Sequence, residues 1–432
     1  MPDLDRSVPL LIVKIGPYPL HHGGVAAIRS LGRLGVPVHA ITEDRFTPAA
    51  VSRYLTGHFV WPTSGLEEPD VLVAGLLDVG RRLGRPAVLL PTDDEAAILV
   101  AEHADVLAER FLAPRIAAGL PRTLADKHGL AELCRAHGIP SPASRLPASV
   151  EELMIDAAEI GYPLVVKNAR PWARLHLRAV GSSTVVDDES AMRALTDRWP
   201  AMPAVLLQQH VPGDPGCDWM VDVYCDATSA PVAAFTGIKV RCWPAGGGVG
   251  SLLQSEPNDR IAELTATLCR AVGYRGIADL DWRLDRRTGE WKLLDFNPRV
   301  GAQFGLFRTD AGIDVVRALH LDLTGRPVPS GAQLDGRGLR VEHLDAPAAL
   351  ASLRGGGPRA PSQLRGRTTQ AWLAPDDPVP AVSAAIRSTG PAAALLARAV
   401  RALAVRVRLR AVRAPVRAAV RAAVRAAARA GR

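Results

Sequence analysis

The stretch WKLLDFNPRVGAQFG, residues 291–305, begins as an apolar strand and then brings together an anion, an amide and a cation. Asp295, Asn297 and Arg299 fall close together, and Pro298 separates the last two. Asn-Pro is a common start of a turn, so charges solvated at a strand end would explain this stretch by itself. The residues before it favour a second interpretation.

The segment before Asp295 splits into two alternating runs around the polar residues 286–289, which is typical of a β-hairpin. Side chains alternate with period two along a strand, so the polar residues of each run share one face. A turn centred on residues 286–289 places Asp281 opposite Leu294 or Asp295, depending on a one-residue choice of register. With the polar faces matched, Asp281 and Asp295 are cross-strand neighbours roughly 5–8 Å apart.

Two carboxylates this close repel each other unless a cation lies between them. Two aspartates and the amide of Asn297 supply the hard oxygen ligands that suit Mg²⁺, and Mn²⁺ accepts the same ligands. Arg299 is expected to face nucleotide phosphates or a substrate carboxylate as a fork-shaped donor. The sequence therefore predicts a metal–nucleotide site at Asp281, Asp295 and Asn297.

An acidic strand, a hairpin and an apolar run that closes on Asp-x-Asn-Pro-Arg resemble the metal-binding end of the ATP-grasp superfamily of carboxylate–amine ligases. That family usually carries glutamate at the position of Asp295. The aspartate keeps the carboxylate but is one methylene shorter.

Two lysines upstream fit the same family. Thr123 and Asp126 form a capping-box start, so a helix is expected near residues 124–137. Lys127 matches the family's D-K-x-x-L pattern before G-I-P-x-P, and the resemblance implies that it contacts nucleotide phosphate. Lys167 interrupts an apolar strand, as the family's second phosphate-binding lysine does in its P-x-V-x-K motif. The alternative for Lys127 is an ordinary exposed lysine on a helix.

The resemblance implies further nucleotide contacts. Gly181 and Ser182 stand in the place of the family's glycine-rich flap over the phosphates, although the segment before them is rich in arginine. AVLLQQHVPG is similar to the hinge strand whose backbone binds adenine. Gln209 in that segment is expected to bond to an adenine edge where the family often has glutamate, and Asp218 is expected to contact the ribose.

FTGIKVRCWPAGGG is expected to place Lys239 and Arg241 on one strand face, just before the glycines of residues 246–248. Three glycines suit a mobile loop that closes over a ligand, while a plain flexible turn is the alternative. The resemblance implies that Lys239, Arg241 and Arg299 act at the reacting phosphoryl group.

The first hundred or so residues alternate strand and helix, which indicates an open parallel sheet with crossover helices. This pattern resembles the domain that precedes ATP-grasp modules and helps to build their substrate pocket. Polar residues at the expected strand ends face that pocket or simply face water as loop residues: His21, His22, Asp93, Asp94 and Glu95.

At 432 residues the chain is too long for one core, since single domains rarely exceed about 250–300 residues. We expect an α/β open parallel sheet followed by α+β ATP-grasp lobes and a basic C-terminal tail. The expected divisions are an N-terminal α/β domain over 1–118, an ATP-grasp domain of two α+β lobes over 119–345, a small peripheral lobe or linker over 346–390 and an Arg/Ala-rich tail, helical or disordered, over 391–432.

Residues 391–432 carry eleven arginines and no acids, whereas the net charge of the whole chain is +8. The basicity therefore belongs to the tail. On a helix the arginines form a basic stripe beside a weakly apolar one, which suits adsorption to anionic lipid; a disordered Ala/Arg repeat fits the same pattern. The tail has no aromatic residue for base stacking, so nucleic acid is not an expected partner.

The five cysteines form no C-x-x-C pair and no zinc spacing with histidine, which is typical of reduced thiols in a cytosolic protein. No secretory signal and no bilayer-spanning apolar run is visible. We expect a cytoplasmic protein, with the tail as a peripheral contact to the inner face of the membrane.

The resemblance implies that Mg-ATP activates a carboxylate as an acyl phosphate and that an amine then displaces phosphate to form an amide. The segments R-S-L-G-x-x-G-V-P-V, residues 29–38, and L-P-T-D-D-E, residues 90–95, look most like the D-aspartate ligase and peptide-ligase branch. The implied partners are small carboxylates and amines, including a peptide or cell-wall precursor, and a second copy of the chain in a homodimer. Two alternatives stay open: a biotin-carboxylase-like enzyme, or a non-catalytic ATP-binding scaffold targeted by its tail.

Overall fold

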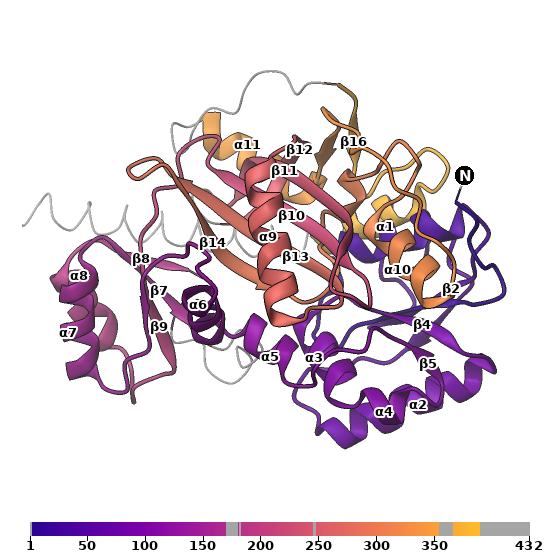
Figure 1. Ribbon diagram of the computed structural model, residues 1–432, viewed down its shortest axis with the longest axis horizontal. Coiled ribbons are helices and arrows are strands. Elements are labelled where there is room, and N and C mark those ends of the chain that lie inside the picture. Colours follow the sequence, from indigo (N-terminus) through magenta and orange to yellow (C-terminus); the bar gives the residue numbers. More distant parts are fainter. Residues whose placement is uncertain (1, 170–179, 181–182, 245–247, 354–365, 389–432) are drawn as a thin grey trace, which may run out of the picture. The chain divides into compact units, whose positions relative to one another are not determined.

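The computed structural model describes residues 2–169, 180, 183–244, 248–353 and 366–388, in two compact units, Met1–Ala381 and Val382–Arg432. Residues 382–388 of the second unit are helical, and the predicted tail over 391–432 lies outside the described residues. The first unit contains three sheets (Figure 1). Within the described ranges, no helix is both long and apolar enough to span a membrane.

The N-terminal sheet has five parallel strands in the order β3-β2-β1-β4-β5, which confirms the predicted open parallel sheet. Its central strand β1 is entirely buried because helices cover both faces, as the continuous apolar run LLIV indicates. The strands are β1 (Leu10–Val13), β2 (Val38–Thr42), β3 (Gly57–Val60), β4 (Ala87–Pro91) and β5 (Phe111–Leu112), and the helices are α1 (His22–Gly32), α2 (Pro69–Leu83), α3 (Asp94–Glu102) and α4 (Ala104–Leu107).

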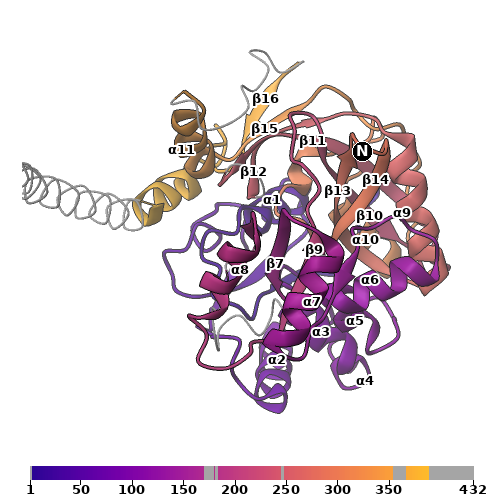
Figure 2. The same ribbon diagram turned by 90° about the vertical axis from the view of Figure 1, so that its left-hand side faces the viewer.

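The second sheet has four antiparallel strands in the order β6-β9-β7-β8, and helices α7 and α8 pack on it (Figure 2). Helix α7 begins after Ser149, whose hydroxyl caps the helix by accepting from the backbone N–H of Glu152. The elements are β6 (Ser144–Arg145), α7 (Val150–Ile160), β7 (Leu164–Asn168), β8 (Thr184–Val186), α8 (Glu189–Thr196) and β9 (Val205–Gln209).

The third sheet has seven strands in the order β14-β13-β10-β11-β12-β15-β16, antiparallel except for the β15–β16 pair. Helix α9 covers one face, where Leu268 packs with Leu280 and Trp282 of β13. The strands are β10 (Asp218–Cys225), β11 (Pro231–Trp243), β12 (Val249–Ser255), β13 (Gly276–Asp285), β14 (Glu290–Asn297), β15 (Gly338–Arg340) and β16 (Thr368–Gln370), with α9 (Asp259–Val272), η2 (Phe304–Leu306), α10 (Val315–Leu323) and α11 (Glu342–Leu353).

The hairpin of β13 and β14 turns at residues 286–289, as the sequence predicts. Its register pairs Asp281 with Asp295, which settles the one-residue choice that the sequence leaves open. The apolar residues of β13 face α9, so the polar residues Asp279 and Asp281 are left for the opposite face of the sheet.

The helix expected near residues 124–137 is wrong at its start. The chain forms a short helix α5 (Leu120–Ala125) and then α6 (Lys127–Ala136). Asp126 between them has an extended backbone, and its carboxylate accepts from the N–H groups of His128 and Gly129. A carboxylate that caps α6 directly is the better N-cap, and the Thr123 hydroxyl instead donates to Gly119 O in the preceding turn.

Candidate functional site

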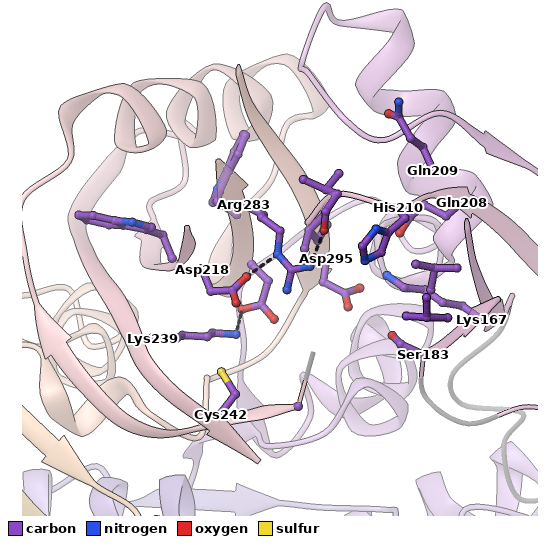
Figure 3. Close-up of a pocket in the computed structure, with 18 residues that line it drawn as sticks. Lys167, Ser183, Gln208, Gln209, His210, Asp218, Lys239, Cys242, Arg283 and Asp295 are labelled. Atoms are coloured by element: carbon purple, nitrogen blue, oxygen red, sulfur yellow. Dashed lines mark hydrogen bonds and ion pairs between the residues drawn. The ribbon is translucent and has the colours of Figure 1, made fainter. Parts of the chain in front are cut away.

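A pocket lies between the second sheet and the face of the third sheet that α9 leaves open (Figure 3). Strands β7 and β9 contribute Lys167 and Gln209 from one side, while β10, β11, β13 and β14 contribute the other. The charged residues that line it are Lys167, Asp218, Lys239, Asp281, Arg283 and Asp295.

Two lysines neutralise the acidic pair in this pocket. Lys239 Nζ donates to Asp281 Oδ1 at 2.6 Å, and the Lys127 ammonium contacts the carboxylate of Asp295. Burial alone would raise the pKa of Asp281, but the charge and hydrogen bond of Lys239 outweigh burial and lower it. The Asp281 side chain is therefore held as a carboxylate beside the Lys239 ammonium.

Lys167 lines the same pocket from the second sheet, across from Asp295 (Figure 3), and is 8% exposed. No carboxylate of the described residues lies within ion-pair distance of its ammonium. Burial, followed by the positive charges of Lys127 and Arg283, lowers the pKa of Lys167 to about 7. A buried cation with cations for neighbours suits an anion.

The predicted metal ligands fit Mg²⁺ as a partial set. No group of three or more His, Cys, Asp or Glu in the described part of the chain is arranged to hold a metal ion. Asp281 and Asp295 lie directly opposite each other, and Asn297 is fixed by donation from its Nδ2 to Asp279 O at 3.0 Å. Two carboxylates and an amide suit an ion that leaves its other positions to water and phosphates.

The residues predicted to bind adenosine are partly engaged within the protein. Gln209 Oε1 accepts from Lys292 Nζ at 3.0 Å, and Asp218 Oδ1 accepts from Arg283 Nε at 2.5 Å. Both Gln209 and Asp218 line the pocket, as does Ser183. Gly181 and Ser182 lie outside the described residues, and so do two of the glycines of residues 246–248.

Arg241 does not reach this pocket, so its predicted place beside Lys239 is wrong. Its guanidinium pairs with Asp345 of α11 at 2.6 Å. The register of β11 shifts between Lys239 and Arg241 and again before Cys242, which interrupts the alternation of side chains. As a result Cys242 lines the pocket, together with Lys239, and Arg241 does not.

Arg299 is partly buried in a second polar cluster next to the N-terminal sheet. Its Nη1 donates to Asp279 Oδ2 at 2.8 Å, and its Nε lies 3.6 Å from Asp94 Oδ1. Burial, and secondly the charge of Arg299, lowers the pKa of His21 to about 3. Burial, and secondly the charge of Asp93, raises the pKa of Glu95 to about 8. These neighbours suit a small polar substrate beside Arg299.

Asp93 has a structural task in this cluster. Its carboxylate accepts from the N–H groups of Ile15 and Gly16 at 2.8 and 2.9 Å, and it caps α3 through the N–H of Ala96. It therefore ties the end of β1 to the start of α3. His22, one residue past His21, packs edge-on against Trp372.

Sequence reasoning assigned no role in these clusters to two buried acids, Asp222 and Asp279, or to Arg283. Arg283 shares the alternating face of Asp279 and Asp281, so its position was visible in the sequence. The sequence gives no sign of the environment of Asp222. Both of its carboxylate oxygens are buried without a hydrogen-bond partner. Burial, and secondly the charge of Asp279, raises the pKa of Asp222 well above its usual range.

No protein-family model matches the chain. The chain is 21% identical over 299 residues to the D-aspartate ligase of Enterococcus faecium, an overlap of 66% of this chain and 70% of that protein. It is 28% identical over 186 residues to a D-alanine–D-alanine ligase of Pseudomonas entomophila, which covers 41% of this chain and 55% of that protein.

Among solved structures, the biotin carboxylase domain of Hydrogenobacter thermophilus 2-oxoglutarate carboxylase shares the fold, with a TM-score of 0.55 and 15% identity. The match covers 75% of this chain and 71% of that one. Together with the lysine and Asp-x-Asn-Pro-Arg motifs, these likenesses point to the ATP-grasp superfamily of carboxylate–amine ligases.

Proposed function

We propose that the protein uses Mg-ATP to join a small carboxylate to an amine through an acyl phosphate, with release of ADP and phosphate. The observation that carries the proposal is that Lys167 from the second sheet and Asp281 and Asp295 from the third sheet line one pocket. The carboxylase domain with the same fold was solved with MgADP and bicarbonate, which supports a nucleotide in the corresponding place.

In this proposal Lys167 and Lys127 bind the nucleotide phosphates, and Gln209 and Asp218 lie at the adenosine end. Asp281, Asp295 and Asn297 hold Mg²⁺, which supplies positive charge to the phosphate oxygens during transfer. The chain thus contributes mainly position and charge, since no covalent nucleophile is required.

Arg299 positions the acid substrate. Its contacts with Asp279 and Asp94 fix the guanidinium at the edge of the N-terminal sheet, beside His21 and Glu95. The carboxylate oxygen attacks the γ-phosphorus of ATP, and the bond to ADP breaks. The amine nitrogen then attacks the acyl carbon, phosphate leaves, and the nitrogen loses a proton.

The likeness to D-aspartate and D-alanine–D-alanine ligases supports an amino acid as one substrate and a peptide or cell-wall precursor as the other. We further propose a homodimer, which sedimentation of the purified chain tests.

The test is ADP release from Mg-ATP in the presence of pooled amino acids, small acids and amines. Asp295→Ala is expected to abolish release because it removes a proposed metal ligand, while circular dichroism stays unchanged. Asp105→Ala is the matched control, since this acid is on α4 and its side chain is 98% exposed. Equal ADP release by wild type and Asp295→Ala would contradict the metal assignment, and ATP binding without turnover would favour a non-catalytic scaffold.

A further inference from the structure

A second cavity lies away from the nucleotide pocket, between helix α1, the turn at η2 and strands β15 and β16. Its volume of about 430 Å³ is in the range of sites for small organic molecules. Five arginines and one carboxylate, Asp314, are among its lining residues: Arg29, Arg33, Arg308, Arg337 and Arg367.

Two of these arginines, and the one acid, are already engaged. Arg29 Nε donates to Asp377 at 2.9 Å and its Nη atoms donate to backbone carbonyls, while Arg33 pairs with Asp376 at 2.7 Å. Asp314 accepts from Ser30 and caps α10. These contacts join α1 to the segment over 371–377 and need no ligand.

Arg308 and Arg337, unlike Arg29 and Arg33, lack a carboxylate partner among the described residues. The Nε of Arg308 is buried and has no hydrogen-bond partner. Burial, and secondly the positive charge of Arg308, lowers the pKa of Arg337. Within the described residues, no carboxylate lies at ion-pair distance from either guanidinium. Two partly buried cations that repel each other create a demand for negative charge.

Part of the remaining wall is apolar, while Ser30, Thr368, Thr369 and Gln370 add neutral polar groups. Phe304, Phe307 and Leu339 line the cavity, and all three are buried in the surrounding core. Guanidinium groups beside an apolar floor fit a molecule with a short carbon body and anionic ends, since arginine binds carboxylate and phosphate groups in fork geometry.

One end of this cavity adjoins the turn that carries Arg299. His22 and Ala302 line that end. A Cβ on Gly23 would lie 2.8 Å from the Cα of Ala302 and 2.9 Å from Gly301 O, so the start of α1 is pressed against this turn. Ala302 follows the proposed substrate-positioning Arg299 by three residues, so a ligand at this end of the cavity would border the same turn.

We propose that this cavity binds a small dianion, either a dicarboxylate or a phosphate monoester, between Arg308 and Arg337. This inference rests on the proposed function: the dianion is one of the two molecules that the enzyme joins. The chain would then select for substrates with two negative charges.

The test is calorimetric titration of the nucleotide-free protein with succinate, glycerol phosphate and acetate. We expect one dianion to bind and acetate to bind far more weakly, and the two dianions distinguish carboxylate from phosphate. Arg308→Gln and Arg337→Gln should each weaken binding roughly tenfold or more, because each removes a charge-assisted contact. Arg81→Gln, on the exposed side of α2, is the control and should bind as the wild type does.

Two further measurements separate this proposal from the proposed function. ATP affinity should be unchanged in Arg308→Gln and Arg337→Gln, and hydrogen exchange of the wild type should slow over residues 302–308 and 337–340 when the dianion is added. Neither dianion binding, or equal binding by all variants, would overturn the cavity assignment. Dianion binding without ADP release under any condition would leave the cavity assigned and refute the ligase activity.

Discussion

Nucleotide binding should take up a proton on Lys167. Burial and the charges of Lys127 and Arg283 lower the pKa of this lysine to about 7 in the free protein. Bound phosphate would favour the charged ammonium and return the pKa toward the ordinary lysine value of about 10.4. The protein should therefore bind ATP more weakly as the pH rises above 7.

The size of this effect follows from the two pKa values. At pH 8 a group with a pKa of about 7 is protonated in roughly one molecule in ten, so binding should take up roughly 0.9 proton. Between pH 7 and pH 9 the affinity for ATP should fall roughly fiftyfold, or ~2.3 kcal/mol. Lys167→Met should bind ATP weakly and with little dependence on pH in this range.

Calorimetry at pH 8 in buffers of different ionisation enthalpy measures this proton uptake directly. The slope of the observed enthalpy against buffer enthalpy should be close to one for the wild type and close to zero for Lys167→Met. Arg193→Met is the matched control, because this cation is exposed on α8 of the same lobe. A zero slope in the wild type, or the same slope in Lys167→Met, would refute the placement of phosphate at Lys167.

Two further predictions concern stability around Asp222. The raised pKa of Asp222 means that its contribution to stability is lost as the pH rises from about 4. Asp222→Asn should therefore raise the free energy of unfolding at pH 8 by roughly 1–3 kcal/mol. Urea titrations should show that this gain shrinks toward pH 4, and a gain that does not change with pH would contradict the reasoning. Gly301→Ala should cost about 1–3 kcal/mol, because its Cβ would lie 2.7 Å from Asp222 Oδ1, and an unchanged urea midpoint would contradict that packing.

The sequence could predict the β13–β14 hairpin because two physical signals agree there. Polar and apolar residues alternate along both runs, and the four residues between them suit a turn. The direct pairing of Asp281 with Asp295 follows once the polar faces are matched. Lys167 was visible for a related reason, since a lysine in an apolar strand needs a partner.

Other parts of the site have no signal of this kind. The register shifts that turn Arg241 away and bring Cys242 in fall between Lys239 and Cys242, a stretch of β11 that itself contains no glycine or proline. Asp222 looks like any polar residue of a half-buried strand until Asp279 and Gly301 are packed against it. Arg308 and Arg337 are separated by almost thirty residues and meet only because β15 joins the third sheet.

The two lysine–aspartate pairs, Lys239 with Asp281 and Lys127 with Asp295, have a consequence for the order of binding. In each pair the aspartate is a partner for a metal ion and the lysine is a partner for a phosphate. Either ligand alone must therefore break an ion pair and leave one charged side chain without a partner. When Mg²⁺ and ATP bind together, each aspartate gains the metal ion and each lysine gains a phosphate, so no charge is left without a partner. Each ligand therefore increases the affinity of the other, and by the same factor. ATP titrated with and without Mg²⁺ should show the same coupling factor as Mg²⁺ titrated with and without ATP, and Lys239→Met should reduce it.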